Sequence, residues 1–319
     1  MAQNRWSMIC LCSHFKSEEG LRPLTTAEFR DLSHLLSRYG KTPGDLFGMN
    51  YNELISMGIA KEPADRLFAL LDRVFVLESL LDSYERIGIR VVTAAEPAYF
   101  PMLKSTLGAN CPPVLCCAGN LSLATKPVIG VVGARDIAPI DAEFAEDAVS
   151  QVLKQGYDIL SGGARGTDSV AESACLRRGG SVVEFPAYPL LQRLRKPEIA
   201  HHVQEGRLLL TTPAAPNTGF STSLAATRNR MIYAHSTATV VVRATHRRGG
   251  TWSGATDALK RSLCPILCRN YPYDGNQGLI QAGALPVDAN SVGEMSAAIK
   301  KSLPTQNLSS EIPKQFSLF

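Results

Sequence analysis

Short apolar segments alternate with helix-like segments over the second half of the chain, and this alternation constrains the fold more than any other feature. The run Pro127 to Gly133 (PVIGVVG) is continuously apolar, as expected of a strand buried on both faces of a parallel sheet. Helical patterns separate it from further strand-like runs at 157–160, 181–185, 207–211, 237–243 and 265–268. Repeated units of this kind predict a doubly wound, extended Rossmann-like parallel sheet, which binds ligands at the carboxyl ends of its strands.

The first part of the chain is predicted to be helical. Thr25 and Glu28 form a capping box ahead of an apolar helical pattern that stops at Gly40. A second start signal follows at 50–53, and a longer helix is expected from about Pro63 to Tyr84. The apolar faces of these helices are most simply explained as the core of a small all-α unit.

These patterns divide the chain into four predicted parts. Four prolines interrupt the chain between residues 97 and 113, which marks a boundary before the alternating region. The expected parts are a helical N-terminal domain of the SAM or helix–hairpin–helix type (1–87), a connector (88–125), the Rossmann-like binding domain (126–290) and a terminal helix with a flexible tail (291–319).

Composition narrows the class of protein. The chain is 45% hydrophobic and 19% charged, which is typical of a globular protein. No apolar run has the length of a membrane span and no signal-peptide pattern opens the chain, so a cytoplasmic location without membrane contact is expected. The eight cysteines fit none of the paired zinc spacings, and His201 and His202 are neighbours, so neither a metal site nor disulfides are expected. A net charge of +4 permits nucleic-acid binding without requiring it.

Four loops that combine small residues with arginine would gather at the carboxyl edge of the predicted sheet. They are residues 133–135, 161–168, 228–230 and 247–251. Glycine lets backbone N–H groups approach an oxyanion, helix N-termini favour negative charge, and arginine offers a bidentate fork to phosphate. The sequence therefore predicts a phosphate-binding face, with the candidate residues Gly133, Arg135, Ser161, Gly162, Gly163, Arg165, Gly166, Asp168, Arg228, Asn229, Arg230, Gly250 and Thr251.

The same loops do not match the common nucleotide-binding motifs. The glycine spacing after the first strand is not G-x-G-x-x-G, and no P-loop is present, so neither a dinucleotide cofactor nor ATP hydrolysis is expected. Asp168 and Glu172 share a helix face and could act as an acid/base pair. We favour the alternative in which Asp168 caps the helix or holds Arg165 or Arg228, and in which Glu172 complements the helix dipole. No catalytic residue and no cofactor are therefore predicted.

The order of these motifs resembles the DNA-processing protein A family, DprA or Smf. The resemblance covers about residues 21–287. Upstream it rests on the stretches 88–93, 99–103 and 112–115. In the predicted sheet domain it rests on Gly133-Ala134-Arg135, SGGARGTD at 161–168, RNRMI at 228–232 and GNQGLIQAGA at 275–284.

This resemblance implies a homodimer that binds single-stranded DNA in a basic pocket and helps to load a RecA-type recombinase onto it. By position, six of the residues above would meet phosphates: Arg135, Ser161, Gly162, Arg165, Arg228 and Arg230. Arg193, Arg195 and Lys196 would extend the basic track. The candidates for base stacking are Tyr188, Phe220 and Trp252.

The chain also departs from this family. Gly163 and Thr167 replace apolar residues, the loop 248–255 follows the usual pattern only loosely, and no C-terminal winged helix is expected. A nucleotide-derived signal sensor therefore stays open as an alternative, as in phage defence. A second alternative is the related lysine-decarboxylase-like (LOG) group of nucleoside monophosphate phosphoribohydrolases. The chain has Val170 where that group places its glutamate, which disfavours hydrolysis.

The last five residues resemble the bacterial sliding-clamp binding pentapeptide. They are Gln315, Phe316, Ser317, Leu318 and Phe319, and a linker-like composition precedes them. A short peptide that anchors two apolar side chains in a preformed pocket suits such a linker. The sequence therefore predicts the sliding clamp as a further partner.

Overall fold

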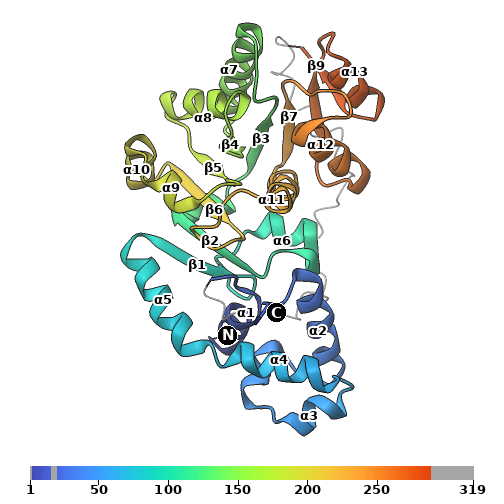
Figure 1. The fold of residues 1–319 in the computed structure, drawn as a ribbon. Helices are drawn as coiled ribbons and strands as arrows, with labels where there is room; N and C mark the ends of the chain where they lie inside the picture. Colours follow the sequence, from blue (N-terminus) through green and yellow to red (C-terminus); the bar gives the residue numbers. More distant parts are fainter. Residues whose placement is uncertain (1, 16–19, 289–319) are drawn as a thin grey trace.

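The computed structural model describes residues 2–15 and 20–288, and these form a helical unit at one end of a nine-stranded mixed sheet (Figure 1). The order in the sheet is β1-β2-β6-β5-β4-β3-β7-β8-β9. The strands are β1 (Ile89–Thr93), β2 (Val114–Gly119), β3 (Val128–Val132), β4 (Asp158–Ser161), β5 (Val182–Glu184), β6 (Leu208–Thr212), β7 (Ala238–Val241), β8 (Ile266–Arg269) and β9 (Leu285–Val287).

The predicted doubly wound parallel sheet is confirmed for the strands β3 to β9. β3 lies at the centre with all five residues buried, and it pairs in parallel with β4 on one side and β7 on the other. The chain winds outward from β3 to β6 and then returns to place β7 beside β3. The strand order therefore reverses between β3 and β7, and this switch point is where open α/β sheets bind ligands.

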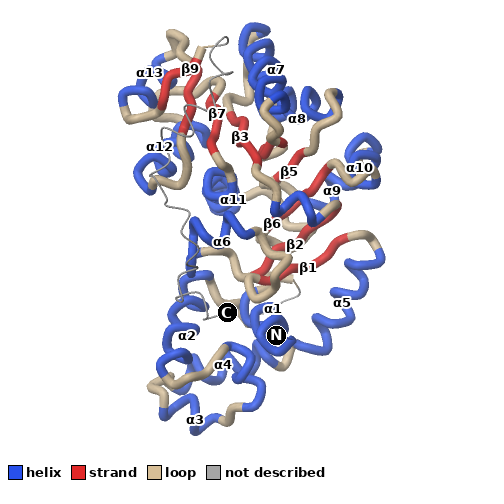
Figure 2. Tube along the Cα trace, turned by 180° about the vertical axis from the view of Figure 1, so that it is seen from behind, coloured by secondary structure: helices blue, strands red, loops and turns tan. Residues whose placement is uncertain are grey.

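Helices cover both faces of this sheet. α7 packs on α8 and α11 packs on α12, as expected for right-handed crossovers on either side of the switch point. Figure 2 shows the strands as one band between these helices. The helices of the sheet region are α6 (Pro101–Leu107), α7 (Pro139–Lys154), α8 (Thr167–Arg177), α9 (Leu190–Leu194), α10 (Pro197–Gln204), α11 (Thr222–His235), α12 (Gly249–Arg261) and α13 (Asp274–Gln281).

Residues 88–125 are more than the expected connector. They form the strands β1 and β2, which belong to the sheet, and the helix α6 between them. β1 pairs antiparallel with β2, and β2 pairs antiparallel with β6, so the sheet is mixed at this edge. The strand at 88–93 was expected, whereas β2 was not, since it directly follows Pro112 and Pro113. Its first five residues are buried, which makes the segment part of the core.

The N-terminal unit contains the expected helices with one correction. The capping boxes at Thr25 and Asn50 are confirmed. The single helix expected over 63–84 is two helices, because the chain turns at Asp72–Arg73 and the buried Arg73 guanidinium donates to the Ser13 carbonyl at 2.9 Å. The elements are α1 (Ala2–Cys12), α2 (Thr26–Arg38), α3 (Tyr51–Ser56), α4 (Lys61–Leu71) and α5 (Val74–Arg86), with a 3₁₀ turn at Pro43–Gly48.

The buried helix α1 has no counterpart in the sequence-based interpretation. Its residues from Ser7 to Cys12 are all buried and consecutive, so they show no helical periodicity. None of the helices in the described part of the chain has the length and apolar character needed to cross a membrane.

Candidate functional site

A pocket of about 480 Å³, here called the switch-point pocket, lies at the carboxyl ends of β3 and β7. Its walls come from the loop after β3, the start of α12 and the inner face of α11. The residues that matter below are Gly133, Arg135, Asp136, Asp168, Arg228, Asn229, Arg243, Arg248, Gly249, Gly250 and Thr251. The pocket therefore joins all four loops expected at this edge, with the loop 161–168 contributing Ala164 and Asp168.

Two further hollows continue the switch-point pocket along the edge of the sheet. The first, of about 380 Å³, shares Arg135 and Arg228 with it and adds Arg165 and Lys196. The second, of about 760 Å³, shares Arg165 and Lys196 with the first and reaches Arg207. Because neighbouring hollows share these lining residues, we treat the three as one surface lined by cations, here called the basic groove.

The glycines of the loop 161–168, here called the opening loop, make closer contacts with the rest of the protein than expected. A Cβ atom on Gly162 would lie 2.1 Å from Nη1 of Arg228, and one on Gly163 would lie 2.1 Å from Oε1 of Glu184. Gly163 also has a φ of +64°, which disfavours other residues. The space beside both glycines is therefore filled by the protein's own side chains, and these glycines position Arg228 and Glu184 beneath the loop.

Gly133 and Gly166 allow two loops to touch. A Cβ atom on Gly133 would lie 2.3 Å from Oγ1 of Thr167, and one on Gly166 would lie 2.3 Å from the Arg135 carbonyl oxygen. The Thr167 hydroxyl and backbone N–H both donate to the Ala134 carbonyl at 3.2 Å. The start of α8 is thus fixed against the loop after β3, with Arg135 exposed beside it.

Asp168 and Arg228 face each other in the floor of the switch-point pocket. Burial raises the pKa of Asp168 to about 6, although Arg228 and the N–H groups of Ala164 and Gly162 oppose this change. Arg228 is only 8% exposed, and its Nε has no hydrogen-bond partner among the described residues. The expected role of Asp168 in holding Arg228 agrees with this geometry.

Arg193 is placed in a buried ion cluster beneath the basic groove. Its guanidinium contacts Glu172 and Glu184, each at 2.7 Å, and all three side chains are at most 9% exposed. Burial and the neighbouring Glu184 raise the pKa of Glu172 well above its ordinary value, against the effect of Arg193. Glu172 therefore forms an ion pair with Arg193. The sequence had suggested instead that it complements the helix dipole.

Tyr188 links the buried ion cluster of Arg193, Glu172 and Glu184 to the opening loop. Its hydroxyl donates to the Gly163 carbonyl at 2.6 Å and lies 3.2 Å from Oε1 of Glu184. Trp252 packs against His246, with ring centroids 4.6 Å apart. Phe220 remains 58% exposed in the basic groove, with the Arg135 guanidinium 6.0 Å from its ring centroid. Of the three stacking candidates, Phe220 is the most exposed, whereas Tyr188 and Trp252 are partly buried.

The structure brings most of the predicted site residues together and separates a few. Those that line the basic groove are Gly133, Arg135, Gly163, Arg165, Asp168, Arg193, Lys196, Arg228, Asn229, Gly250 and Thr251. Ser161 is fully buried, and Gly162 and Gly166 act through packing. Arg230 pairs with Asp257 at 3.2 Å on the outer side of α11, and Arg195 is exposed beyond the groove lining.

Arg243 is a pocket residue that the sequence analysis missed. It was assigned to the end of a strand, whereas it follows β7 and lines the switch-point pocket. Its guanidinium pairs with the buried Asp141 at 3.2 Å and lies 4.5 Å from the ring centroid of Tyr273. Its position at the carboxyl end of a predicted strand was the feature of the sequence that could have identified it as a pocket residue.

The motif at 275–284 packs against the loop after β7, which forms one wall of the switch-point pocket. Asn276 is fully buried, accepts from the Ala244 N–H at 2.9 Å and donates to the Val242 carbonyl at 3.1 Å. A Cβ atom on Gly275 would lie 2.0 Å from the Ala244 carbonyl oxygen. This part of the motif therefore fixes the loop after β7.

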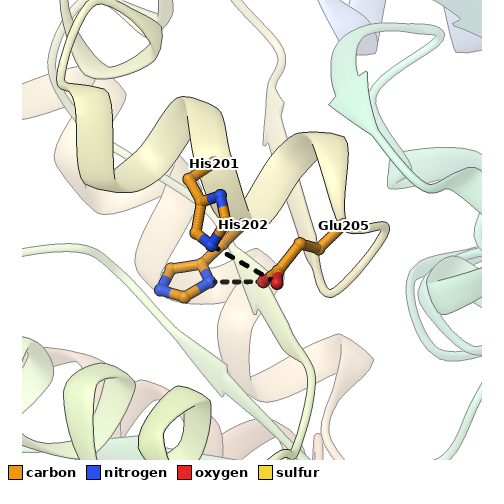
Figure 3. A group of neighbouring side chains, drawn as sticks. All are labelled: His201, His202 and Glu205. Carbon is orange, nitrogen blue, oxygen red and sulfur yellow. Dashed lines mark hydrogen bonds and ion pairs between the residues drawn. The ribbon is translucent and has the colours of Figure 1, made fainter.

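His201 and His202 of α10 form a surface cluster with Glu205, which directly follows this helix (Figure 3). The two rings both face the Glu205 carboxylate, at 3.3 Å and 3.1 Å, although neighbouring helical residues were expected to diverge. The guanidinium of Arg207 contacts the same carboxylate and lies 3.3 Å from His202 Nδ1. A positive charge thus already contacts two of the three candidate ligands, and we assign the cluster to a surface ion-pair network.

The sheet, its switch point and the basic groove define a Rossmann-like α/β protein with a cation-lined edge. The chain belongs to the DNA recombination-mediator protein A family, whose family model matches residues 90–299. This match includes both antiparallel strands of the sheet edge except for Ile89.

Individual relatives agree with this family. The DNA processing protein DprA of Bacillus subtilis (strain 168) is 25% identical over 176 residues, 54% of this chain. The chain spans 58% of the length of that relative. A structure of DNA processing protein A from Streptococcus pneumoniae has a TM-score of 0.66 at 20% identity, covering 88% of this chain and 93% of that one.

A second solved structure has the same fold. It is DNA processing protein A from Helicobacter pylori, described for its single-stranded DNA binding mode, with a TM-score of 0.54 at 20% identity. The match covers 68% of this chain and 97% of that chain. Both structures support the extended Rossmann-like architecture of the chain.

Proposed function

We propose that this chain binds single-stranded DNA along the basic groove and acts in DNA processing as a binding protein. The observation that carries the proposal is a row of neighbouring hollows along the carboxyl edge, which share the cations Arg135, Arg228, Arg165 and Lys196. Spaced cations and an open aromatic ring are what a single strand needs for phosphate contact and base stacking. The description of the Helicobacter pylori relative supports the same ligand.

The geometry gives less support to the phosphoribohydrolase alternative. A general acid or base must reach its substrate, whereas Glu172 is 5% exposed and is held by Arg193. Asp168 is 4% exposed and faces Arg228. These carboxylates are better suited to positioning the arginines of a binding site than to catalysis.

We further propose the partners that the family resemblance implies. These are a second copy of the chain, a RecA-type recombinase loaded onto the bound strand, and the sliding clamp. The clamp contact would use Gln315 to Phe319, which lie outside the described residues, so this part of the proposal rests on the sequence alone. The cytoplasmic setting expected from the sequence suits all three partners.

A salt-series titration tests the DNA-binding proposal. Wild-type protein should bind a fluorescent oligonucleotide with an affinity that falls steeply with salt, because phosphate contacts release counterions. Arg135→Ala should weaken binding. It should also make the negative slope of log K against log salt shallower by about 0.7, the value for one phosphate contact on a single strand. Lys61→Ala removes an exposed cation from α4 and should leave both quantities unchanged. No binding at low salt would contradict the proposal.

Phe220→Ala tests base stacking separately from charge. Loss of an aromatic platform costs about 1–3 kcal/mol per stacked base, so affinity for an oligothymidine should fall at least about fivefold. An abasic oligonucleotide of the same length has the phosphates without the bases, and its affinity should be unchanged by the substitution. Phe75→Ala, at a ring 79% exposed on α5, is the matched control. An equal loss for both ligands would contradict stacking.

A further inference from the structure

Positive charge gathers in the switch-point pocket. Its lining contains the four guanidinium groups of Arg135, Arg228, Arg243 and Arg248. The two carboxylates in the lining are already engaged, because Asp136 pairs with Arg165 at 2.9 Å and Asp168 faces Arg228. Neither carboxylate is therefore left to neutralise the other arginines.

The remaining arginines of the pocket are only partly compensated. Arg243 shares the carboxylate of Asp141 with Arg269, so this group carries one positive charge in excess. Arg135 and Arg248 are exposed, and neither forms an ion pair with a residue in the described part of the chain. The surroundings of the pocket thus have an excess of three positive charges, counting Asp168 as ionised.

Backbone donors add to these charges at the same place. The 13-residue helix α12 begins at Gly249, and its first N–H groups have no partner within the helix. Thr251 Oγ1 donates to the Gly133 carbonyl at 2.8 Å and Asn229 Nδ2 donates to the Gly250 carbonyl at 3.2 Å, which fixes this helix start in the wall. The buried Nε of Arg228, without a partner, is a second and independent unsatisfied donor in the lining.

An excess of three charges is more than a single phosphodiester, with one negative charge, requires. A phosphomonoester carries between one and two negative charges at neutral pH and has three terminal oxygens. A volume of about 480 Å³ also lies in the range of sites for small molecules, and it can hold a nucleotide.

We propose that the switch-point pocket binds a phosphomonoester, carried either by the end of a DNA strand or by a free nucleotide. The phosphodiesters of the strand then occupy the rest of the basic groove. For the strand end, this inference deepens the proposed function and rests on it.

Fluorescence anisotropy with three oligonucleotides of one sequence tests the inference. One has a 5′-phosphate, one has a 3′-phosphate and one has hydroxyl groups at both ends. One phosphorylated form should bind about tenfold more tightly than the hydroxyl form, a gain of the size expected for charge-assisted hydrogen bonds. Arg248→Ala should remove this preference, so that the three oligonucleotides bind this variant with equal affinity. Arg247→Asn is the matched control, because Arg247 lies outside the lining and its φ of +53° is tolerated by asparagine.

The possible outcomes separate this inference from the proposed function. Equal affinity for all three oligonucleotides, together with no Arg248-dependent stabilisation by a nucleoside monophosphate, would overturn the phosphomonoester site while DNA binding stands. A preference that persists in Arg248→Ala would overturn its assignment to this pocket. Competition by a nucleoside monophosphate, but not by the nucleoside, would support a free nucleotide as ligand. Stabilisation by the monophosphate that depends on Arg248, without any oligonucleotide binding, would support the pocket and contradict the proposed function.

Discussion

Replacing Arg193 with alanine is expected to lower the free energy of unfolding by about 3–5 kcal/mol at neutral pH, the cost of leaving buried charges without their partner. The guanidinium contacts Glu172 and Glu184 at 2.7 Å each, and these carboxylates have no access to solvent that could replace it. Chemical denaturation, followed by circular dichroism, measures the loss. Arg195→Ala changes the same residue type at an exposed position, and it should stay within about 0.5 kcal/mol of wild type.

The effect of Arg193→Ala should depend on pH with a definite sign. Without the arginine, the already raised pKa of Glu172 should rise further in the folded state. A carboxyl group with a raised folded pKa destabilises the protein above the unfolded pKa, and the penalty disappears when both states are protonated. The loss should therefore be largest at neutral pH and shrink as the pH falls toward about 4. Similar small losses in Arg193→Ala and Arg195→Ala would contradict the buried ion cluster.

The sheet and its binding edge were predictable because they depend on local patterns. Continuous apolar runs such as Val128–Val132 mark buried parallel strands, and the loops after them must meet at one edge. Arg135, Arg165 and Arg228 were found in this way. The antiparallel strand β2 was missed because two prolines precede it, and the break at Arg73 was missed because the apolar periodicity continues through it.

The roles of individual arginines were less predictable, because they depend on partners far along the chain. Arg193 and Lys196 look equivalent in the sequence, yet Glu172 is 21 positions from Arg193 and draws it below the surface. Arg230 shares a motif with Arg228, but its side chain forms an ion pair with Asp257 on α12. The glycines of the opening loop were assigned to a ligand, whereas the structure uses two of them to admit buried side chains.

Gly162→Ala is expected to reduce affinity for single-stranded DNA about 10- to 100-fold, if Arg228 contacts phosphate through hydrogen bonds worth about 1.5–3 kcal/mol. The new Cβ would lie 2.1 Å from Nη1 of Arg228 and 2.9 Å from Oδ2 of Asp168. Since Arg228 is 8% exposed, its guanidinium has little room to move aside without leaving the pocket floor. Overpacking of this kind also costs about 1–3 kcal/mol of stability. Titration of the oligonucleotide and denaturation measure the two effects.

Two further variants show whether Arg228 transmits the effect of Gly162→Ala. Gly219→Ala adds the same methyl group near Phe220, where no atom lies within 4 Å, and it should change neither affinity nor stability. In the double variant Gly162→Ala/Arg228→Ala, the methyl group meets no guanidinium, so part of the stability lost to overpacking should return while DNA affinity stays low. The two substitutions should then be strongly non-additive in affinity, because each removes the same phosphate contact. Wild-type affinity in Gly162→Ala, or additive losses in the double variant, would show that Arg228 does not bind the strand from this position.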